Sequence, residues 1–453
     1  MFVHLVKRPF QSLVLRNTFR NSGSLSQNRY SSSQINKENV AFAGTMNDVK
    51  TEIVKKLGIQ ENWSALPKSR EYLAQYEPKS VDDLPARSMK DSFTSALLPL
   101  SQDLALRDKY VTFMGSVRLG RLMEDMDLFA VWVLHQHVKL PNLDPSIPLP
   151  YTFVTLFVDS INFTDHIPKN DSDIRLSGHV SWVGRSSVEV VVWLEQKFQG
   201  RWRKLTRALF LMACRNATNS AAAIVNPLNP ENDGEKKIFT GGENRKRKRI
   251  QLQKESIFHG QEPSAFEQKL IHNIFMKTMD LNNKNKTFNV RKIPSGAIWM
   301  EDAQLSNVIY SHPEDRNAHN SVFGGYLMRQ ALELSWGLVY TLNEGRCRLR
   351  CINDITFSRP VPVSSLLKMH AHLVYTEVNY MVIVVINETY DAISGEHTTS
   401  NVFYYTYSCD VPVNQIIPKT YNEAMWYLDG RRKFIAAVGG EDEKIEGLTQ
   451  KSG

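Results

Sequence analysis

Asn317 and two glycines form the first group of residues whose types and spacing could do chemistry. The stretch from Asn317 to Ser321 is polar, and Gly324-Gly325 then opens a segment with helical apolar spacing. The first turn of a helix presents unpaired backbone N–H groups and the positive end of the helix dipole. Because glycine lets a ligand approach the backbone closely, this junction is a candidate oxyanion site. Close packing of the helix on a sheet is the alternative.

Asp127 is the second candidate. It lies seven residues after Gly120 on a predicted helix, where it shares one stripe with three apolar residues, Met123, Ala130 and Leu134. Burying a carboxylate against apolar side chains costs free energy, unless the carboxylate has a partner or a function that maintains it. Burial would also raise its pKa and suit it to accept a proton from water. The alternative is a solvated acidic face that Asp127 forms with Glu124 and Asp125.

An internal repeat supplies the elements that must position these residues. Gly120-Arg-Leu-Met-Glu and Gly325-Tyr-Leu-Met-Arg are 205 residues apart, and each begins a helical pattern. Strand-like segments then repeat at offsets of 194 and 193 residues, Asp159–Phe163 with Asn353–Phe357 and Val188–Leu194 with Met381–Asn387. The smaller offset is accounted for by an extra Pro-rich loop, 141–150, in the first copy.

Each copy is predicted to be one long helix followed by β-branched strands. A helix wrapped by a curved antiparallel sheet is the hot-dog arrangement. The sequence therefore predicts an α+β double hot dog, in which two tandem domains form an intramolecular pseudo-dimer. We place an N-terminal extension at 31–84, the first domain at 85–225 and the second at 255–435. The segment 226–254, which contains the basic run Arg245–Arg249, is interpreted as a solvated linker, and 436–453 as a flexible tail.

A head-to-tail pair of hot dogs brings the helix of one copy against the loop of the other. One such site combines Asp127 with the Asn317 loop, whereas the equivalent positions of the other site are Leu332 and Thr112. Glu333 lies one residue out of register, about 100° around the helix. The repeat thus predicts a single working site in each chain.

The net charge of +8 is concentrated at the N-terminus. Residues 1–30 contain five basic residues and no acidic one, and they are rich in Ser and Asn with short apolar clusters. This composition is typical of a mitochondrial presequence, with processing near Arg29-Tyr30-Ser31 and a matrix location; a disordered basic tail is the alternative. Little basic excess remains for a nucleic-acid partner. No apolar run approaches the ~18–20 residues of a membrane span.

Cysteine usage limits the chemistry further. The chain has four cysteines, Cys214, Cys347, Cys351 and Cys409. They are too few for a disulfide scaffold, and no zinc-ligand pattern accompanies them. We therefore expect reduced thiols and no structural metal. A Ser-His-Asp hydrolase is disfavoured because the sequence contains no Gly-x-Ser-x-Gly motif.

At Asn317–Gly325 and Gly120–Asp127 the sequence resembles the hot-dog acyl-coenzyme A thioesterases. In that family an Asn stands seven residues before the first glycine of a Gly-Gly turn, and an Asp stands seven residues after the second glycine on the opposite helix. Longer stretches, Ser177–Gly184 and Asn226-Pro-Leu, look like the mitochondrial acyl-coenzyme A thioesterase 9 subfamily. Leu119-Gly120 departs from the family's Gly-Gly, which puts an oxyanion role for the first helix in doubt.

The resemblance implies hydrolysis of an acyl-coenzyme A thioester to a free fatty acid and coenzyme A. Coenzyme A is part of this substrate, and no separate cofactor or metal is needed. Asp127 would act as general base on water, or as a nucleophile that forms an anhydride. Asn317 would orient the water or the thioester, and the N–H of Gly325 would stabilise the oxyanion.

The resemblance also implies where the rest of the substrate lies. Gly324 would face the substrate, and Arg185 and Ser187, in a strand turn, would meet coenzyme A phosphates. Buried methionines would set the length of the acyl chain, with Met123, Met126 and Met328 as candidates. Further association of double hot dogs into a homo-oligomer, a trimer above all, is implied as well.

Three alternatives stay open at this point. His319 is close enough to the proposed site to replace Asp127 as the base. A hot-dog enoyl-thioester hydratase or dehydratase would share the fold, although neither predicted helix start provides the His and acidic partner it needs. A non-catalytic acyl-coenzyme A sensor, or an RNA-binding scaffold that uses Arg245–Arg249, would need no base at all.

Overall fold

A computed structural model describes residues 42–58, 69–163, 167–254, 261–279, 291–312, 314, 316–317, 321–343, 345–357, 359–363, 365–391 and 394–438. The predicted presequence, His319 and the end of the chain from Gly439 lie outside the described residues. Within the described part, no helix is long and apolar enough to cross a membrane.

The predicted repeat is present as two matching central helices. Helix α3 spans Leu119–His137 and helix α6 spans Gly324–Leu342. Each has 19 residues, and their bounds differ by the predicted offset of 205. Apolar residues at three- and four-residue steps give each helix a buried face, which includes Phe129 and Val133 in α3 and Ala331 and Leu338 in α6. The two helices pack against each other.

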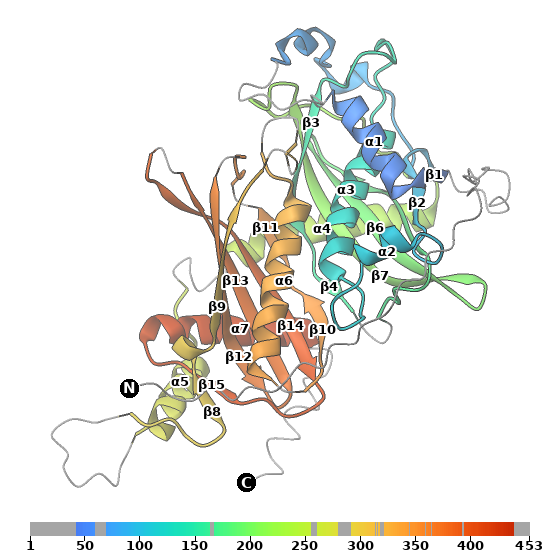
Figure 1. The fold of residues 1–453 in the computed structure, drawn as a ribbon. Coiled ribbons are helices and arrows are strands. Elements are labelled where there is room, and N and C mark those ends of the chain that lie inside the picture. The colour runs from blue at the N-terminus through green and yellow to red at the C-terminus, as the bar shows by residue number, and fades with distance from the viewer. Residues whose placement is uncertain are drawn as a thin grey trace, which may run out of the picture. The chain divides into compact units, whose positions relative to one another are not determined.

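The strands of both halves join into one sheet, which has 13 strands in the described residues (Figure 1). The first half supplies β2 Thr94–Leu98, β3 Tyr151–Val158, β4 Ile161–Asn162, β5 Ile174–Val183, β6 Ser187–Phe198 and β7 Arg201–Asn216. The second half supplies β9 Gln304–Tyr310, β10 Cys347–Ile352, β11 Ile355–Phe357, β12 Leu366–Glu377, β13 Tyr380–Tyr390 and β14 His397–Cys409.

The strand order shows how the halves meet. It runs β1-β2-β5-β6-β7-β3-β11-β14-β13-β12-β9, and β10 pairs with both β14 and β4. The two halves are joined where β3 pairs with β11 and β4 pairs with β10, both antiparallel. This continuous sheet with one long helix for each half is the predicted α+β double hot dog.

Helices cover both faces of the sheet (Figure 1). Neighbouring residues of a strand point to opposite faces, and in β14 the hydroxyl of Tyr405 donates to the carbonyl oxygen of Met328 in α6. The ring of the preceding residue, Tyr404, lies 5.3 Å from the amine of Lys433 in α7, which spans Tyr421–Val438. Helices α3 and α6 therefore share one face, and α7 lies on the other.

The N-terminal extension covers the edge of the first half. Strand β1, Phe42–Thr45, pairs in parallel with β2. Helix α1, Met46–Leu57, begins with a capping box between Thr45 and Asp48 and buries one face, made of Met46, Val49, Ile53 and Leu57. The remaining elements are α2 Leu104–Asp108, α5 Ala265–Lys277 and the parallel pair β8 Ala297–Trp299 with β15 Gln415–Ile417.

The interpretation of 226–254 as a solvated linker was wrong for most of its length. Asp233–Lys254 forms helix α4, which packs on β5. Two of its arginines, Arg245 and Arg249, lie one turn apart and both bond to the carboxylate of Glu189. Glu189 is fully buried and needs a cationic partner. The first residues of the predicted tail, 436–438, are likewise helical, since they complete α7.

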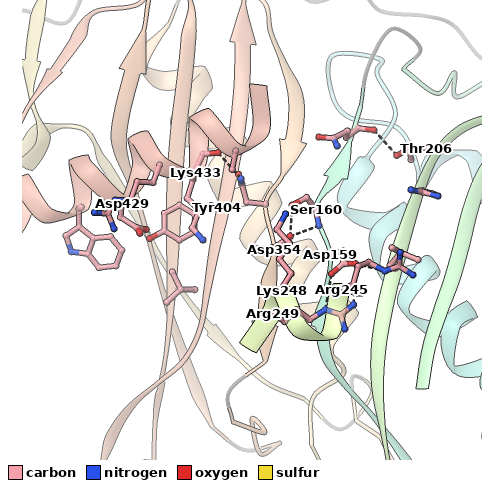
Figure 2. Close-up of a pocket in the computed structure, with 18 of the residues that line it drawn as sticks. Asp159, Ser160, Thr206, Arg245, Lys248, Arg249, Asp354, Tyr404, Asp429 and Lys433 are labelled. Atoms are coloured by element: carbon pink, nitrogen blue, oxygen red, sulfur yellow. Dashed lines mark hydrogen bonds and ion pairs between the residues drawn. The ribbon is translucent and has the colours of Figure 1, made fainter. Parts of the chain in front are cut away.

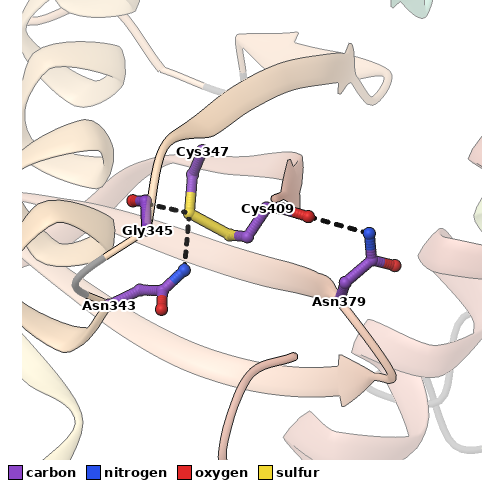
Figure 3. Close-up of a disulfide and its surroundings, with 5 residues drawn as sticks. All are labelled: Asn343, Gly345, Cys347, Asn379 and Cys409. Atoms are coloured by element: carbon purple, nitrogen blue, oxygen red, sulfur yellow. Dashed lines mark hydrogen bonds between the residues drawn. A yellow bond between two sulfur atoms is a disulfide. The ribbon is translucent and has the colours of Figure 1, made fainter. Parts of the chain in front are cut away.

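The expectation of reduced thiols was wrong for two of the four cysteines. Cys347 in β10 and Cys409 in β14 form a disulfide (Figure 3). These two residues stand directly opposite each other in the antiparallel pair, where Cβ atoms come within disulfide reach. Cys214 and Cys351 are free and buried. The strand register that brings the pair together cannot be read from cysteine spacing.

Candidate active site

Asp127 lies where the two halves meet. It is on the third turn of α3 and its side chain is 3 % exposed. One carboxylate oxygen, Oδ1, accepts a hydrogen bond from the hydroxyl of Thr155 in β3 at 2.7 Å. The other, Oδ2, accepts from the backbone N–H of Gly325 at 2.7 Å. The carboxylate is thus held by its own half at one oxygen and by the opposite half at the other.

Burial controls the protonation of this carboxylate. Removal from water raises the pKa of Asp127 from 3.8 to about 6, although the bonds from Thr155 and Gly325 oppose the rise. Nearby Glu124 adds a small upward push to the same pKa. A carboxylate with this pKa is mostly ionised near neutral pH and is basic enough to take a proton from water. Of the two interpretations of Asp127, the structure therefore favours the buried residue over the solvated acidic face.

Gly325 is needed for the close approach of the two helices. A Cβ on Gly325 would lie 3.0 Å from the Cα and the carbonyl oxygen of Glu124, and 3.1 Å from the Cβ of Asp127. A Cβ on the preceding Gly324 would meet the ring of Phe357 at 3.1 Å and Oδ2 of Asp127 at 3.6 Å. The glycine pair therefore lets the N-terminus of α6 rest on α3. The packing is helix on helix, whereas the sequence alternative was helix on sheet.

Asn317 lies in the loop before α6, and its described hydrogen bonds shape that loop. Its backbone N–H donates to the carbonyl oxygen of Ser321 at 2.7 Å, and its side-chain oxygen accepts from the N–H of Ser321 at 3.1 Å. Arg316 and Val322 form a bridge beside this turn. These bonds fix where the loop enters α6; they do not join Asn317 to Asp127.

Thr155 is a site residue that sequence reasoning missed. It is one of two buried threonines in the mostly apolar strand Tyr-Thr-Phe-Val-Thr-Leu-Phe-Val. A buried hydroxyl needs a hydrogen-bond partner, so Thr155 carried a signal that pointed to a polar neighbour on the helix. The identity of that neighbour depends on the packing of β3 on α3, which the strand sequence does not contain.

Arg185 and Ser187 lie in the turn between β5 and β6. The turn closes through the N–H of Gly184, which donates to the carbonyl oxygen of Ser187 at 2.8 Å, and Arg185 is exposed. Val188, next to Ser187, is in register with Met212 of β7, which is in register with Thr155 of β3. Two strand spacings correspond to roughly 10 Å, so the turn stands at the same end of the sheet as Asp127.

The second, pseudo-equivalent position keeps the glycine of the first but has leucines in place of the aspartate and the threonine. Leu332 occupies the place of Asp127 and is 4 % exposed, and Leu349 occupies the place of Thr155. Gly120 again rests on the opposite helix, with its Cβ position 3.2 Å from the carbonyl oxygen of Arg329. Glu333 points elsewhere and pairs with Arg118 at 2.6 Å. Among the described residues, the Asp127–Thr155–Gly325 arrangement therefore occurs once.

Known proteins with a similar sequence span most of the chain. No protein-family model matches the chain. The chain is 37 % identical over 397 residues to human mitochondrial acyl-coenzyme A thioesterase 9, which covers 87 % of this chain and 89 % of that protein. It is 38 % identical over 394 residues to mouse mitochondrial acyl-coenzyme A thioesterase 10, covering 86 % and 88 %.

Two solved structures illustrate the range of similar folds. A Staphylococcus aureus acyl-CoA hydrolase matches 35 % of this chain and 99 % of its own, with 18 % identity and a TM-score of 0.30. A Bacteroides thetaiotaomicron acyl-ACP thioesterase matches 71 % of this chain and 100 % of its own, with 13 % identity and a TM-score of 0.41.

Proposed function

The chain belongs to the acyl-coenzyme A thioesterase family, and we propose that it hydrolyses acyl-coenzyme A thioesters to a free fatty acid and coenzyme A. The main observation behind the proposal is a contact between the two halves: the buried carboxylate of Asp127 accepts a hydrogen bond from the N–H of Gly325 at 2.7 Å. One face of the substrate carbonyl group would lie at this contact.

Asp127 is the general base in this proposal. With a pKa of about 6 its carboxylate is ionised at mitochondrial pH and can take a proton from a water molecule. The water oxygen then attacks the thioester carbonyl carbon and forms a tetrahedral oxyanion. When the carbon–sulfur bond breaks, the coenzyme A thiolate takes the proton back from Asp127, and the carboxylate is ready for the next cycle. Direct attack by Asp127, through an anhydride, is the alternative route.

Gly325 has two uses in the cycle. In the free enzyme its N–H holds Oδ2 of Asp127. In the complex the thioester carbonyl oxygen takes the place of Oδ2 at this N–H, which releases Oδ2 to accept the water proton. The same N–H, at the positive end of the α6 dipole, then stabilises the oxyanion. Thr155 keeps its bond to Oδ1 throughout and orients the carboxylate.

Asn317 orients the attacking water or the thioester from the loop before α6. This role requires its side-chain oxygen to leave the N–H of Ser321, or its amide nitrogen to face the substrate while that bond stays. Gly324 faces the thioester, because a side chain there would meet Oδ2 of Asp127. Both residues act at the thioester, whereas the acyl and nucleotide ends of the substrate lie farther away.

Other groups bind the two ends of the substrate. Arg185 and Ser187, at the same end of the sheet as Asp127, meet the phosphates of coenzyme A. The acyl chain runs between helix and sheet, where the fully buried methionines Met123, Met126 and Met328 limit its length.

We place the protein in the mitochondrial matrix, on the composition of residues 1–30 and on the mitochondrial names of its relatives. We also propose that it forms a homo-oligomer, with a trimer of double hot dogs as the expected assembly. Size-exclusion chromatography with light scattering measures this mass directly, and a monomeric mass of 51.8 kDa would contradict the assembly.

The activity is tested with the full chain and two substrate classes. Saturated acyl-coenzyme A esters of several chain lengths should release free coenzyme A thiol, which a thiol reagent detects. An enoyl-coenzyme A ester should lose its thioester and keep its double bond. Hydration of the double bond without thiol release would indicate a hydratase, and tight binding without turnover of either ester would indicate a sensor.

A further inference from the structure

A cleft with both charged and apolar walls lies on the far side of the sheet from Asp127. It has a volume of about 1130 Å³ and is lined by residues of both halves, among them Thr206 and Tyr404 (Figure 2). Tyr404 belongs to the face of β14 that α7 covers, opposite the face that carries α6. In β7 Leu209 lines the cleft, so by strand alternation the buried neighbour Phe210 points to the opposite face of the sheet. The cleft is therefore separate from the proposed active site.

Cationic side chains dominate this cleft. Six cationic and three acidic side chains line it, so its charge excess is positive. Three of the cations are already paired: Arg245 and Arg249 with Glu189, and Arg432 with Glu267. These pairs are structural, because they join α4 and α7 to neighbouring elements.

The other three cations have no carboxylate within ion-pair distance among the described residues. They are Arg207 of β7, Lys248 of α4 and Lys433 of α7. They come from three separate elements and line the same cleft; Arg207 and Lys248 are exposed and Lys433 is half-buried. Figure 2 labels Lys248 and Lys433 among the lining residues. Like charges that face one cavity repel one another, and a bound anion removes this repulsion.

One of the paired arginines that line the cleft, Arg249, also has a donor without a partner among the described residues. Nη1 of Arg249 is buried and has no hydrogen-bond partner in the described structure, although the other nitrogens of this guanidinium bond to Glu189 and Asp159. A buried donor without a partner is costly, and ligands or ordered water usually satisfy it. The three acidic groups of the cleft already have partners: Asp354 accepts from the N–H of Ser160 at 2.7 Å, Asp159 bonds to Arg249, and Asp429 bonds to Tyr404.

We propose that this cleft binds a small phosphate-bearing anion through Arg207, Lys248 and Lys433, independently of the acyl-coenzyme A site. A phosphate group carries more than one negative charge and three strong acceptor oxygens, which matches several cations better than a single carboxylate does. The volume is that of an ordinary ligand site. Tyr404, under Lys433, gives one wall an aromatic surface for the rest of the ligand.

Binding of sodium tripolyphosphate to the full chain tests this proposal. Calorimetric titration at low salt should show saturable binding that weakens when sodium chloride is added. The double variant Lys248→Gln/Lys433→Gln should bind at least tenfold more weakly, or about 1.4 kcal/mol. The control Lys237→Gln/Arg247→Gln removes two exposed charges of α4 that do not line the cleft, and it should bind within twofold of the wild type.

Several results would overturn the proposal. One is no saturable binding by a wild-type chain with a normal melting temperature. Another is an equal loss of binding in the control variant, which would mean unspecific attraction to α4. A third is a raised KM for acyl-coenzyme A in the Lys248→Gln/Lys433→Gln variant, which would assign the cleft to the nucleotide end of the substrate. An unchanged KM with weakened tripolyphosphate binding supports a separate site.

Discussion

The two places where a helix of one half meets the other half share a backbone and differ in chemistry. At one, Gly325 rests on α3 and its N–H meets the carboxylate of Asp127; at the other, Gly120 rests on α6 and the place of Asp127 is held by Leu332. The glycine is present at both, so the close approach of the helices is a requirement of the fold. The carboxylate is present at only one of these two positions, so the fold does not require it, in keeping with the catalytic role that we propose for it.

Because the two halves belong to one chain, their two positions can differ in sequence, whereas two identical chains must carry identical sites. In a symmetric dimer any change at one site appears at both. In a single chain one position can keep a costly buried carboxylate while the other fills with apolar side chains that stabilise the core. Leu332 and Leu349 are both buried in this way. Five predictions test the roles of the two positions and of the groups around the first.

The largest effect is expected from Asp127→Asn, which removes the base and keeps the shape. Turnover of acyl-coenzyme A should fall at least ~100-fold. Glu333→Gln, on the helix of the second position, is the matched control and should stay within about twofold of the wild type. Near-normal turnover in Asp127→Asn would indicate that His319, and not Asp127, is the general base.

Asp127→Asn should also be more stable than the wild type above pH 6. The folded-state pKa of Asp127 lies about two units above its ordinary value, so ionisation costs the folded state about 3 kcal/mol, and stability falls as pH rises from about 4 to 6. Denaturant unfolding at pH 8 should show the gain, and at pH 4 it should vanish. A variant that is less stable at both values would mean that its lost activity reflects damage to the fold.

The next effect compares the two glycines. Gly325→Ala should lower turnover by about 30-fold, because the added Cβ meets backbone atoms at 3.0 Å and shifts the N–H away from Asp127. Gly120→Ala should destabilise the fold by a similar mechanism but change turnover less than about threefold. Steady-state kinetics and thermal melting of both variants measure this contrast. Equal losses of turnover would mean that both helix ends take part in the reaction.

Thr155→Val should have a smaller effect that depends on pH. The wild-type kcat/KM should rise with pH to a midpoint near 6 and then level off, because the ionised base is the active form. Loss of the Thr155 hydroxyl removes a bond to the charged form, so the midpoint should move up by about one unit, with about a fivefold loss at pH 6 and about a tenfold loss well below it. Thr155→Ser should restore both. An unchanged midpoint of kcat/KM in Thr155→Val would mean that Thr155 has a purely structural role.

The smallest effect is expected at the substrate's nucleotide end. Arg185→Gln should raise KM about fivefold and leave kcat unchanged, because an exposed arginine makes a modest ion pair with a phosphate. Arg201→Gln, at the start of β7, removes the same charge and should have no effect on KM. A fall in kcat for Arg185→Gln would contradict a binding role.

The sequence was enough to predict the double hot dog and the placement of its helices. Residue offsets carry that information directly, since α3 and α6 begin 205 residues apart. It was also enough to select Asp127, because a carboxylate in an apolar helical stripe is unusual. The sequence could not predict the buried partners of helix α4, because Arg245 bonds to Glu189, which is 56 residues away in the chain. A basic run that pairs with a buried carboxylate has the same composition as a basic run in solvent.

Strand register explains the other omissions. The Thr155 hydroxyl finds Asp127, and Cys347 finds Cys409, only when particular strands lie opposite particular partners. A shift of one residue would turn each of these side chains to the other face. Such partners follow from tertiary packing and not from local pattern.

The pKa of Asp127 in the folded protein tests the central claim most directly. Carbon-13 NMR of the chain labelled at the aspartate carboxyl groups gives this value, and the signal absent from Asp127→Asn assigns it. We expect the Asp127 carboxyl signal to titrate with a midpoint of about 6, the same as the midpoint of kcat/KM. A midpoint near 4, in a folded and active protein, would place this carboxylate in water and contradict its role as the base held between the two halves.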